Sequence, residues 1–400
     1  MPAPFTRPAS RIAQAGLALL LSMLVAVAAP PPALLAGGPP TTTDPALAAA
    51  GWLAEQVESD PSLGAGVLAD AIFAFAAVGA GQAAAATALA GIEANLDAYV
   101  APGGSLAPGA LAKAMLAVQI QGGDPTAFGG RDLEADLRSL MTVGGPDDGR
   151  FGVGSVLDQS LAILALSRTA GDAPAAAAAW LSASQCPSGE YAWDGSCPAA
   201  AGSEDPDTTA IALQALLATG ATTAAEAATA WLLSIQQAGG GLPSFGLANT
   251  NSSGVGGQAL RAAGETAAAD ATAAFVLSLA FGCDADPSEV GAIGWAVGIP
   301  GFLVFSTPQA ILALGAPPLD QLSAAGAMSD APVLECAATG PSPSQPAATP
   351  APSPAPTNDA NELPDTAVSG GADAPTWVVI VLVAGAALTM TRRRARRAAR

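Results

Sequence analysis

The sequence predicts an all-α domain of six helix pairs, in which an inner set of helices is surrounded by an outer set. Three observations favour this fold class. Between residues 44 and 319, a pattern of two helices joined by a glycine-rich loop recurs about every 45 residues. One helix of each pair is apolar at nearly every position, which is typical of a helix buried on most sides. The other helix is centred on a tryptophan or another large apolar residue.

Residues 1–36 have the features of a secretory signal peptide. Two arginines precede an uncharged apolar run over residues 15–29, and small residues follow as far as Ala36. Three consecutive prolines from Pro30 end the run abruptly, which argues against a buried N-terminal helix. We therefore expect an exported protein.

Residues 205–220, DPDTTAIALQALLATG, show the inner helix most clearly. Asp205 suits the N-cap, Pro206 the first turn and Gly220 the C-terminal end. The outer helices are centred on Trp52, Ile92, Leu137, Trp180, Trp231 and Phe275. The inner helices begin near Gly66, Pro108, Ser155, Asp205, Ser252 and Ser306. Alanine and glycine dominate the inner set, and they permit the close approach that a ring within a ring needs.

The loops that lead into the inner helices would all lie at one end of such an array. These loops carry aromatic residues, the helix starts carry polar ones, and together they form our candidate ligand-binding site. Its predicted residues are Phe151, Asp158, Tyr191, Trp193, Asp207, Phe245, Asn251, Phe305 and Gln309. Asp70, Gln159, Thr208, Ser252 and Thr307 belong to the same polar end. The alternative is that the polar residues are ordinary helix caps and that the aromatic residues fill the loops.

Histidine and cysteine usage limits the chemistry. The chain has no histidine, which removes the usual general base and the commonest zinc ligand. Its four cysteines show no C-x-x-C spacing, and in an exported chain such cysteines favour disulfides over a metal site. We pair Cys186 with Cys197 across a short loop and Cys283 with Cys336, and we expect no metal and no cofactor.

The charge balance excludes one class of partner. The chain carries 33 acidic and 14 basic residues, and eight of the basic ones lie near the two termini. Nucleic acid is therefore not an expected partner, because phosphate binding needs a basic surface. The acidity either serves solubility or attracts a cationic ligand or calcium.

The C-terminal part is a spacer followed by an anchor. Residues 337–362 are rich in proline, serine, alanine and threonine and predict a disordered linker. Next come an apolar run over residues 377–390, predicted as a hydrophobic helix, and an arginine-rich tail. At about 21 Å the run is shorter than the roughly 30 Å core of a bilayer, so a transient retention signal is favoured over a permanent span.

Residues 363–400 resemble a sortase sorting signal. The pentapeptide that stands where LPxTG is found consists of Leu363, Pro364, Asp365, Thr366 and Ala367. Alanine replaces the usual glycine, which leaves open which sortase would accept it. The resemblance implies sortase and the cell wall as partners, with the membrane holding the C-terminal segment before processing. Simple membrane anchoring is the alternative, and either reading places the protein outside the cell.

The repeat resembles a known family. The Trp-Leu outer helix, the glycine-aromatic loop and the inner-helix stretch TTAIALQAL resemble the α/α-toroid repeats of terpenoid cyclases, protein prenyltransferase β subunits and transcobalamin-like carriers. NSSGVGGQALRAAG and STPQAILALG are similar to the last repeats of the carriers. The resemblance implies an α/α toroid (α6/α6 barrel) over residues 44–319. Through the carrier branch it also implies a corrinoid-like or other small ligand.

Three enzyme activities of related folds can be compared with the residues. In the cyclases the middle aspartate of DxDDTA donates a proton, so the resemblance implies Asp207 as that acid, with Thr208 replacing the neighbouring aspartate. Protein prenyltransferases hold zinc partly through histidine, which this chain lacks. Helical barrels also host carbohydrate-active enzymes, and Glu190 and Asp194 beside Trp193 are the candidate carboxylates. We expect a non-catalytic binding module. A cyclase-like or carbohydrate-active enzyme and a purely structural surface protein remain alternatives.

Overall fold

The computed structural model describes residues 39–337 apart from residues 61, 198–204, 245 and 300. The predicted signal peptide, the spacer beyond residue 337, the pentapeptide at 363–367, the C-terminal hydrophobic run and Phe245 lie outside the described residues. Within the described ranges, no helix is both long enough and apolar enough to cross a bilayer.

The regular elements of the described part are helices apart from four two-residue strands, which confirms the all-α prediction. The inner helices are α2 (Ala65–Val78), α5 (Pro108–Ile120), α7 (Val156–Ser167), α9 (Pro206–Thr219), α11 (Thr250–Ala262) and α13 (Leu303–Leu312). The outer helices are α1 (Pro45–Ser59), α3 (Gln82–Ala94), α6 (Leu133–Ser139), α8 (Ala175–Ala183), α10 (Thr222–Ile235) and α12 (Thr266–Leu277). Shorter pieces are α4 (Leu96–Val100), η1 (Pro102–Gly104) and η2 (Pro125–Ala127).

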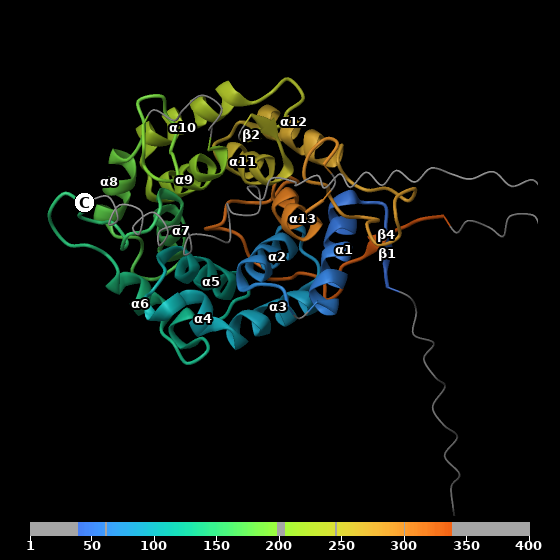
Figure 1. The fold of residues 1–400 in the computed structure, drawn as a ribbon, viewed down its shortest axis with the longest axis horizontal. Helices are drawn as coiled ribbons and strands as arrows, with labels where there is room; N and C mark the ends of the chain where they lie inside the picture. Colours follow the sequence, from blue (N-terminus) through green and yellow to red (C-terminus); the bar gives the residue numbers. More distant parts are fainter. Residues whose placement is uncertain (1–38, 61, 198–204, 245, 300, 338–400) are drawn as a thin grey trace, which may run out of the picture. The chain divides into compact units, whose positions relative to one another are not determined.

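The inner helices form a closed ring (Figure 1). Each one packs against the next in chain order, from α2 through α5, α7, α9 and α11 to α13, and α13 packs back against α2. The outer helices pack on the ring, as α3 does on α2 and α12 on α11. Inner helices are buried on nearly all sides, and the core of alanine, leucine and isoleucine side chains lies between the two layers.

A glycine in each of four loops joins one repeat to the next. Gly149, Gly189, Gly240 and Gly291 all have φ between 87° and 97°, and their Cα atoms press against backbone of the outer helices α8, α10, α12 and α1. A Cβ would overlap or crowd the carbonyl groups there, and positive φ disfavours any other residue. The glycine-rich loops are therefore packing elements of the repeat, and the last one closes the outer layer onto α1.

The residue two positions after each glycine is buried and bonded to the following inner helix. The backbone N–H groups of Phe151, Tyr191, Leu242 and Ile293 donate to the side chains of Gln159, Thr209, Ser253 and Thr307 at 2.9–3.0 Å. All four apolar or aromatic side chains are at most 1% exposed. In each of these four repeats, one buried side chain and one hydrogen bond therefore anchor the loop to the core.

The chain after α13 crosses the end of the ring opposite to these loops. Leu319 N–H donates to the Gln214 side chain of α9, and Ala324 N–H donates to the Ile120 carbonyl at the end of α5. The chain then forms β4 (Val333–Leu334), which pairs in parallel with β1 (Thr41–Thr42). A second pair, β2 (Pro243–Ser244) and β3 (Leu247–Ala248), is antiparallel. Packed structure therefore extends beyond the predicted 44–319 range on both sides.

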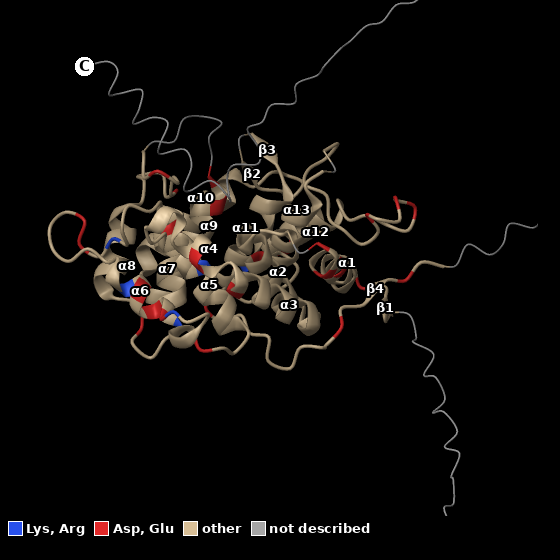
Figure 2. Cartoon of the chain, turned by 60° about the horizontal axis from the view of Figure 1, so that its bottom comes forward, with Lys and Arg blue, Asp and Glu red and all other residues tan. Residues whose placement is uncertain are grey.

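Both predicted disulfides are present. Cys186 is bonded to Cys197 and Cys283 to Cys336, each with a Cα–Cα distance of 5.5 Å. The second bond fastens the C-terminal segment beside β4 to the loop that follows α12. Disulfides are consistent with an extracellular environment. Figure 2 shows acidic positions spread over helices and loops and several of the few basic positions near α6, where Arg131 and Arg138 form ion pairs.

Candidate functional site

A cavity of about 520 Å³ lies in the inner ring, with every inner helix contributing to its wall. Six of its residues form a belt, one from each inner helix: Asp70, Lys113, Leu161, Ile211, Val255 and Gln309. Leu161, Ile211 and Val255 are each the sixth residue after their helix N-cap, as are Asp70 and Lys113. The repeat therefore delivers an equivalent side chain from five of the inner helices to the same level, and α13 contributes Gln309, the seventh residue after its N-cap.

A second level lies one helical turn nearer the helix N-termini. Gly109, Leu157, Asp207 and Asn251 are each the second residue after their helix N-cap. The first three line the cavity. Because residues four apart share a helix face, Asp207 lies above Ile211 and Asn251 above Val255.

One side of the belt is polar. Lys113 Nζ lies 2.7 Å from Asp70 Oδ1, and both side chains are largely buried. Gln309 Nε2 donates to Asp70 Oδ2 at 3.4 Å, and Asn251 Nδ2 donates to Gln309 Oε1 at 2.7 Å. These contacts form a continuous polar arc across α5, α2, α13 and α11.

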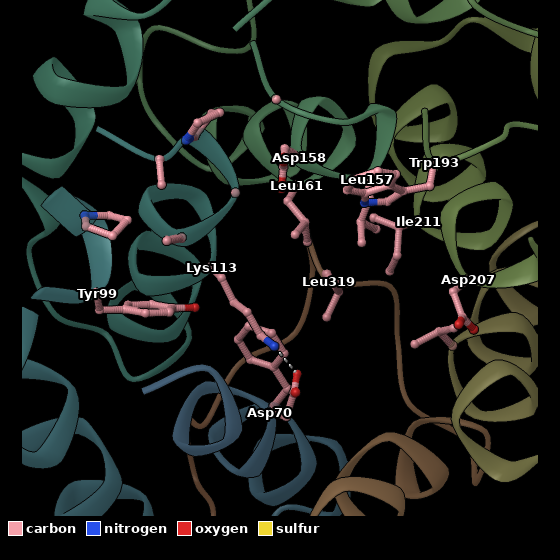
Figure 3. A pocket seen from close by; sticks show the side chains of 18 of the residues that line it. Asp70, Tyr99, Lys113, Leu157, Asp158, Leu161, Trp193, Asp207, Ile211 and Leu319 are labelled. Atoms are coloured by element: carbon pink, nitrogen blue, oxygen red, sulfur yellow. Dashed lines mark ion pairs between the residues drawn. The ribbon is translucent and has the colours of Figure 1, made fainter. Parts of the chain in front are cut away.

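The other side is apolar. Leu157, Leu161 and Ile211 form the wall on α7 and α9, and Leu319 contributes from the segment that crosses the end of the ring. Figure 3 shows the Lys113–Asp70 pair on one side of the cavity and Asp207 on the other. The cavity thus presents a largely apolar surface with a few polar groups at its edges, the usual character of a small-molecule site.

Asp207 is the most perturbed carboxyl of the cavity. Burial raises the pKa of Asp207 to about 7, the neighbouring Asp205 carboxyl adds to the effect, and the Ser252 hydroxyl opposes it. Asp207 Oδ1 has no hydrogen-bond partner among the described residues. A carboxyl in this state exchanges a proton near neutral pH and can bind a ligand through its free oxygen.

Two further titratable groups face the cavity from α7 and α4. Asp158 forms a capping box with Ser155, and burial raises the pKa of its carboxyl. Burial also raises the pKa of the Tyr99 hydroxyl well above its usual range, and the Asp70 and Asp158 carboxylates contribute. Tyr99 is therefore a neutral hydrogen-bonding group on the wall at physiological pH.

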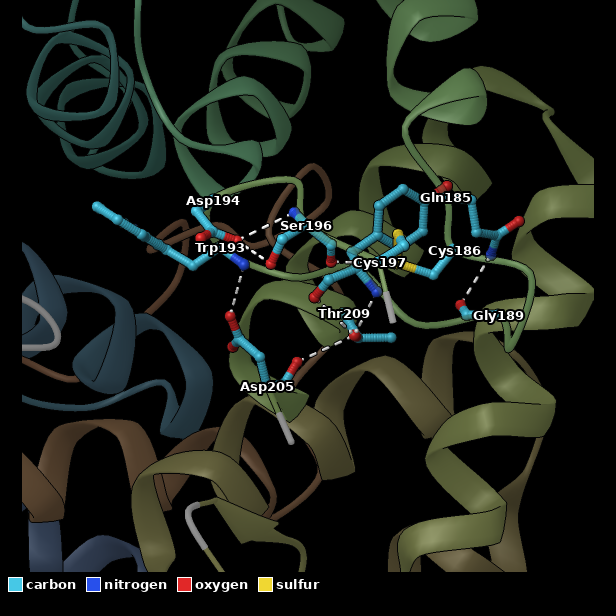
Figure 4. Close-up of a disulfide and its surroundings, with 10 residues drawn as sticks. Gln185, Cys186, Gly189, Trp193, Asp194, Ser196, Cys197, Asp205 and Thr209 are labelled. Carbon is cyan, nitrogen blue, oxygen red and sulfur yellow. Dashed lines mark hydrogen bonds between the residues drawn. A yellow bond between two sulfur atoms is a disulfide. The ribbon is translucent and has the colours of Figure 1, made fainter. Parts of the chain in front are cut away.

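Trp193 lines the cavity from the loop between α8 and α9 (Figure 3). The Cys186–Cys197 disulfide closes this loop (Figure 4). Trp193 N–H donates to Asp205 Oδ2 at 2.9 Å, and the Trp193 carbonyl accepts from Val156 N–H at 3.1 Å. The indole is 44% exposed, so it stands at the boundary between the cavity and solvent.

The structure brings four of the nine predicted ligand-binding residues into the cavity wall: Asp158, Trp193, Asp207 and Gln309. Asn251 is bonded to Gln309 and to the carbonyl of Phe305, whose side chain is half-buried outside the wall. Phe151 and Tyr191 are two of the buried loop residues described above, and they do not line the cavity. For these two residues the loop-filling alternative describes the observed packing.

The two other candidate carboxylates do not line the cavity. Glu190 is buried at the base of the disulfide loop. Asp194 is exposed, and hydrogen bonds from the Ser196 hydroxyl and N–H lower the pKa of its carboxyl. An acid with a lowered pKa is a poor proton donor at neutral pH.

Lys113 and Tyr99 were absent from the predicted site. Lys113 is the only lysine of the chain and stands inside an otherwise apolar inner helix, which is a signal that could have marked it. Tyr99 carries no such signal, because it comes from a short helix outside the six pairs.

Comparisons with known proteins give a similarity to solved structures. No family model matches the chain, and no curated protein matches it. Among solved structures, the chain is similar to ent-copalyl diphosphate synthase from Streptomyces platensis, with 20% identity and a TM-score of 0.43. The match covers 63% of this chain and 50% of that one, so the chain spans about half the length of that structure. At this score the similarity carries no conclusion about what the chain binds or does.

Proposed function

We propose that this chain is an exported, surface-anchored module of the α/α-toroid type that binds a small molecule in its central cavity without converting it. The observation that carries the proposal is the cavity itself. Its volume of about 520 Å³ lies within the range of typical ligand sites, and its wall is largely apolar with a few convergent polar groups.

The toroid assignment is supported by the closed contact order of the inner helices and by the outer helices that pack on them. Export and anchoring are supported by the signal-like N-terminus, the two disulfides and the sorting-signal-like C-terminus. Sortase and the cell wall are the proposed partners of that C-terminus. Corrinoids stay among the proposed ligands because of the carrier resemblance.

A second function, acid-catalysed cyclisation, is favoured by one observation. Asp207 faces a largely apolar wall and carries a proton up to a pH of about 7. Transfer of that proton to a carbon–carbon double bond would leave a carboxylate on Asp207 and a carbocation on the ligand. The resemblance to the cyclase motif implies the same role, with Thr208 in place of the aspartate that normally follows.

A ligand screen on the full chain tests the proposal. Corrinoids, isoprenoids, long-chain alcohols and glycans are compared by how much each raises the melting temperature. A ligand present at about 100 times its Kd increases the free energy of unfolding by about 2.7 kcal/mol. We expect one class to stabilise the protein, Leu161→Trp to abolish the effect by filling the cavity, and Leu217→Trp on the exposed side of α9 to retain it.

The same samples, analysed by mass spectrometry, separate the two functions. Unchanged ligand supports binding alone. A product that disappears in Asp207→Asn supports the acid function instead. A well-folded protein that no class stabilises would refute both.

A further inference from the structure

The charges of the cavity are unequal. Among the described residues that line it, three are aspartates and one is a lysine: Asp70, Asp158, Asp207 and Lys113. Asp70 is neutralised by Lys113 and also accepts from Gln309. Asp158 Oδ2 accepts the Ser155 N–H in its capping box. Asp158 and Asp207 have no cation partner among the described residues, and Asp207 Oδ1 also accepts no hydrogen bond from them.

Two more oxygens, on the neighbouring inner helix α11, are also without hydrogen-bond partners in the part of the chain that the structure describes. They are Ser252 Oγ and Asn251 Oδ1, both in the first turn of α11. Ser252 is only 1% exposed, and its hydroxyl is close enough to the Asp207 carboxyl to lower its pKa. A ligand donor placed here would give the Ser252 oxygen a hydrogen bond that no described residue supplies to it.

The unmatched groups at this place are mainly hydrogen-bond acceptors. Both N–H groups of the Asn251 amide are already used, by the Phe305 carbonyl and by Gln309 Oε1. Asn251 can therefore only accept. The ionised Asp207 carboxyl also only accepts, and the Ser252 hydroxyl can do so. The complementary group carries several donors and a positive charge, which describes a primary ammonium with its three N–H groups.

Asp207 lines the cavity, and Asn251 and Ser252 lie at the start of the neighbouring inner helix α11. Asp207 and Asn251 are equivalent residues of neighbouring inner helices, each one turn above a residue of the cavity wall, Ile211 or Val255. The apolar side chains of Leu157, Leu161 and Ile211 extend from this end along the wall. An alkyl chain that leaves the polar end would lie against them.

We propose that Asp207, Asn251 and Ser252 form a subsite for the ammonium group of an apolar primary amine, whose hydrocarbon body lies in the cavity. This inference rests on the proposed small-molecule function and names the ligand class of the same site. It requires the ionised form of Asp207, so the amine lowers the pKa of that carboxyl when it binds and releases its proton.

The test compares two ligands of equal length on the full chain by titration calorimetry at pH 8. Octylammonium chloride carries the charge, and octanol is its neutral counterpart. We expect the amine to bind at least tenfold more tightly than the alcohol. Asp207→Asn should weaken the amine at least tenfold and leave the alcohol within twofold. Ser252→Ala should weaken the amine by a smaller factor.

Two variants provide controls. Glu226→Gln removes the same charge from the exposed face of α10 and should leave both affinities unchanged. Leu161→Trp fills the cavity and should abolish the binding of both ligands. Circular dichroism of each variant confirms that the helices are retained.

The outcomes separate the two claims. If the alcohol binds as tightly as the amine, or if Asp207→Asn does not weaken the amine, the ammonium subsite is refuted and the binding cavity stands. If neither ligand binds, or if both still bind to Leu161→Trp, the ammonium subsite is refuted, and the ligand screen alone then decides whether the cavity binds another class of small molecule.

Discussion

Replacing Asp207 with asparagine should stabilise the protein at pH 8 and change its stability little at pH 4. The pKa of this carboxyl is about 7 in the folded protein and 3.8 in the unfolded chain. Below 3.8 both states hold the proton. As the pH rises from 3.8 to about 7, the unfolded chain releases the proton and the folded protein keeps it, so stability falls until the loss is complete above pH 7.

The size of the effect follows from the same two values. At 1.36 kcal/mol per pH unit, the interval between 3.8 and about 7 corresponds to about 4 kcal/mol. Asparagine removes this cost, because it has no charge to bury. It also loses the attraction of a carboxylate for the N-terminus of α9, about 0.5 kcal/mol. We therefore expect a net gain of about 3.5 kcal/mol at pH 8.

Urea denaturation of the wild-type protein and the variant from pH 4 to pH 8 measures this difference. The control is Asp194→Asn, where the sign reverses. Hydrogen bonds from Ser196 lower the pKa of the Asp194 carboxyl, so that group stabilises the fold at neutral pH and loses its contribution as the pH falls. Its effect should be small, because Asp194 is exposed. A stability difference between wild type and Asp207→Asn that is the same at pH 4 and pH 8 would contradict the reasoning.

Two further predictions concern the ring. A Cβ on Gly254 would overlap the backbone of α13, so Gly254→Ala should destabilise the protein by about 2 kcal/mol. A Cβ on Gly66 would have its nearest neighbour 3.6 Å away, so Gly66→Ala should stabilise the protein by about 0.5 kcal/mol. Thermal unfolding measures both variants, and equal melting temperatures would contradict the close approach of Gly254 to α13. Lys113→Met should lower the free energy of unfolding by about 3 kcal/mol, because it leaves Asp70 buried without its cation. The double variant with Asp70→Leu should recover most of that loss in urea denaturation. A double variant as unstable as the single one would show that the charge pair is not the cause.

The fold could be predicted because its signals are local and repeated. Asp205, Pro206 and Gly220 mark one helix, and the same order of signals returns in the other repeats with little change. Every predicted outer centre and inner start falls within or beside the corresponding helix. The disulfide pairing followed from loop length and chain order. None of these predictions needed to know which way a side chain points.

The site was predicted less completely, because it depends on direction. Phe151 and Trp193 stand in similar loops, yet one enters the core and the other reaches the cavity. The difference follows from position: Phe151 comes two residues after its loop glycine and is held by Gln159, whereas Trp193 lies two residues beyond the equivalent Tyr191. Composition alone does not distinguish these positions.

Alternate residues at the start of the inner helices make different contacts. The residue four positions after the N-cap turns toward the preceding loop in α7, α9 and α11, where Gln159, Thr209 and Ser253 hold loop backbone. The residues two and six positions after the N-cap both line the cavity in α5, α7 and α9. The first set must keep a hydrogen-bonding side chain for the repeats to join. The second set does not have to keep a hydrogen-bonding side chain, because the residue at one level is the apolar Leu157 in α7 and the acidic Asp207 in α9. Polar groups in that second set are therefore not required by the ring, which is why we propose a ligand-binding role for the unmatched Asp207.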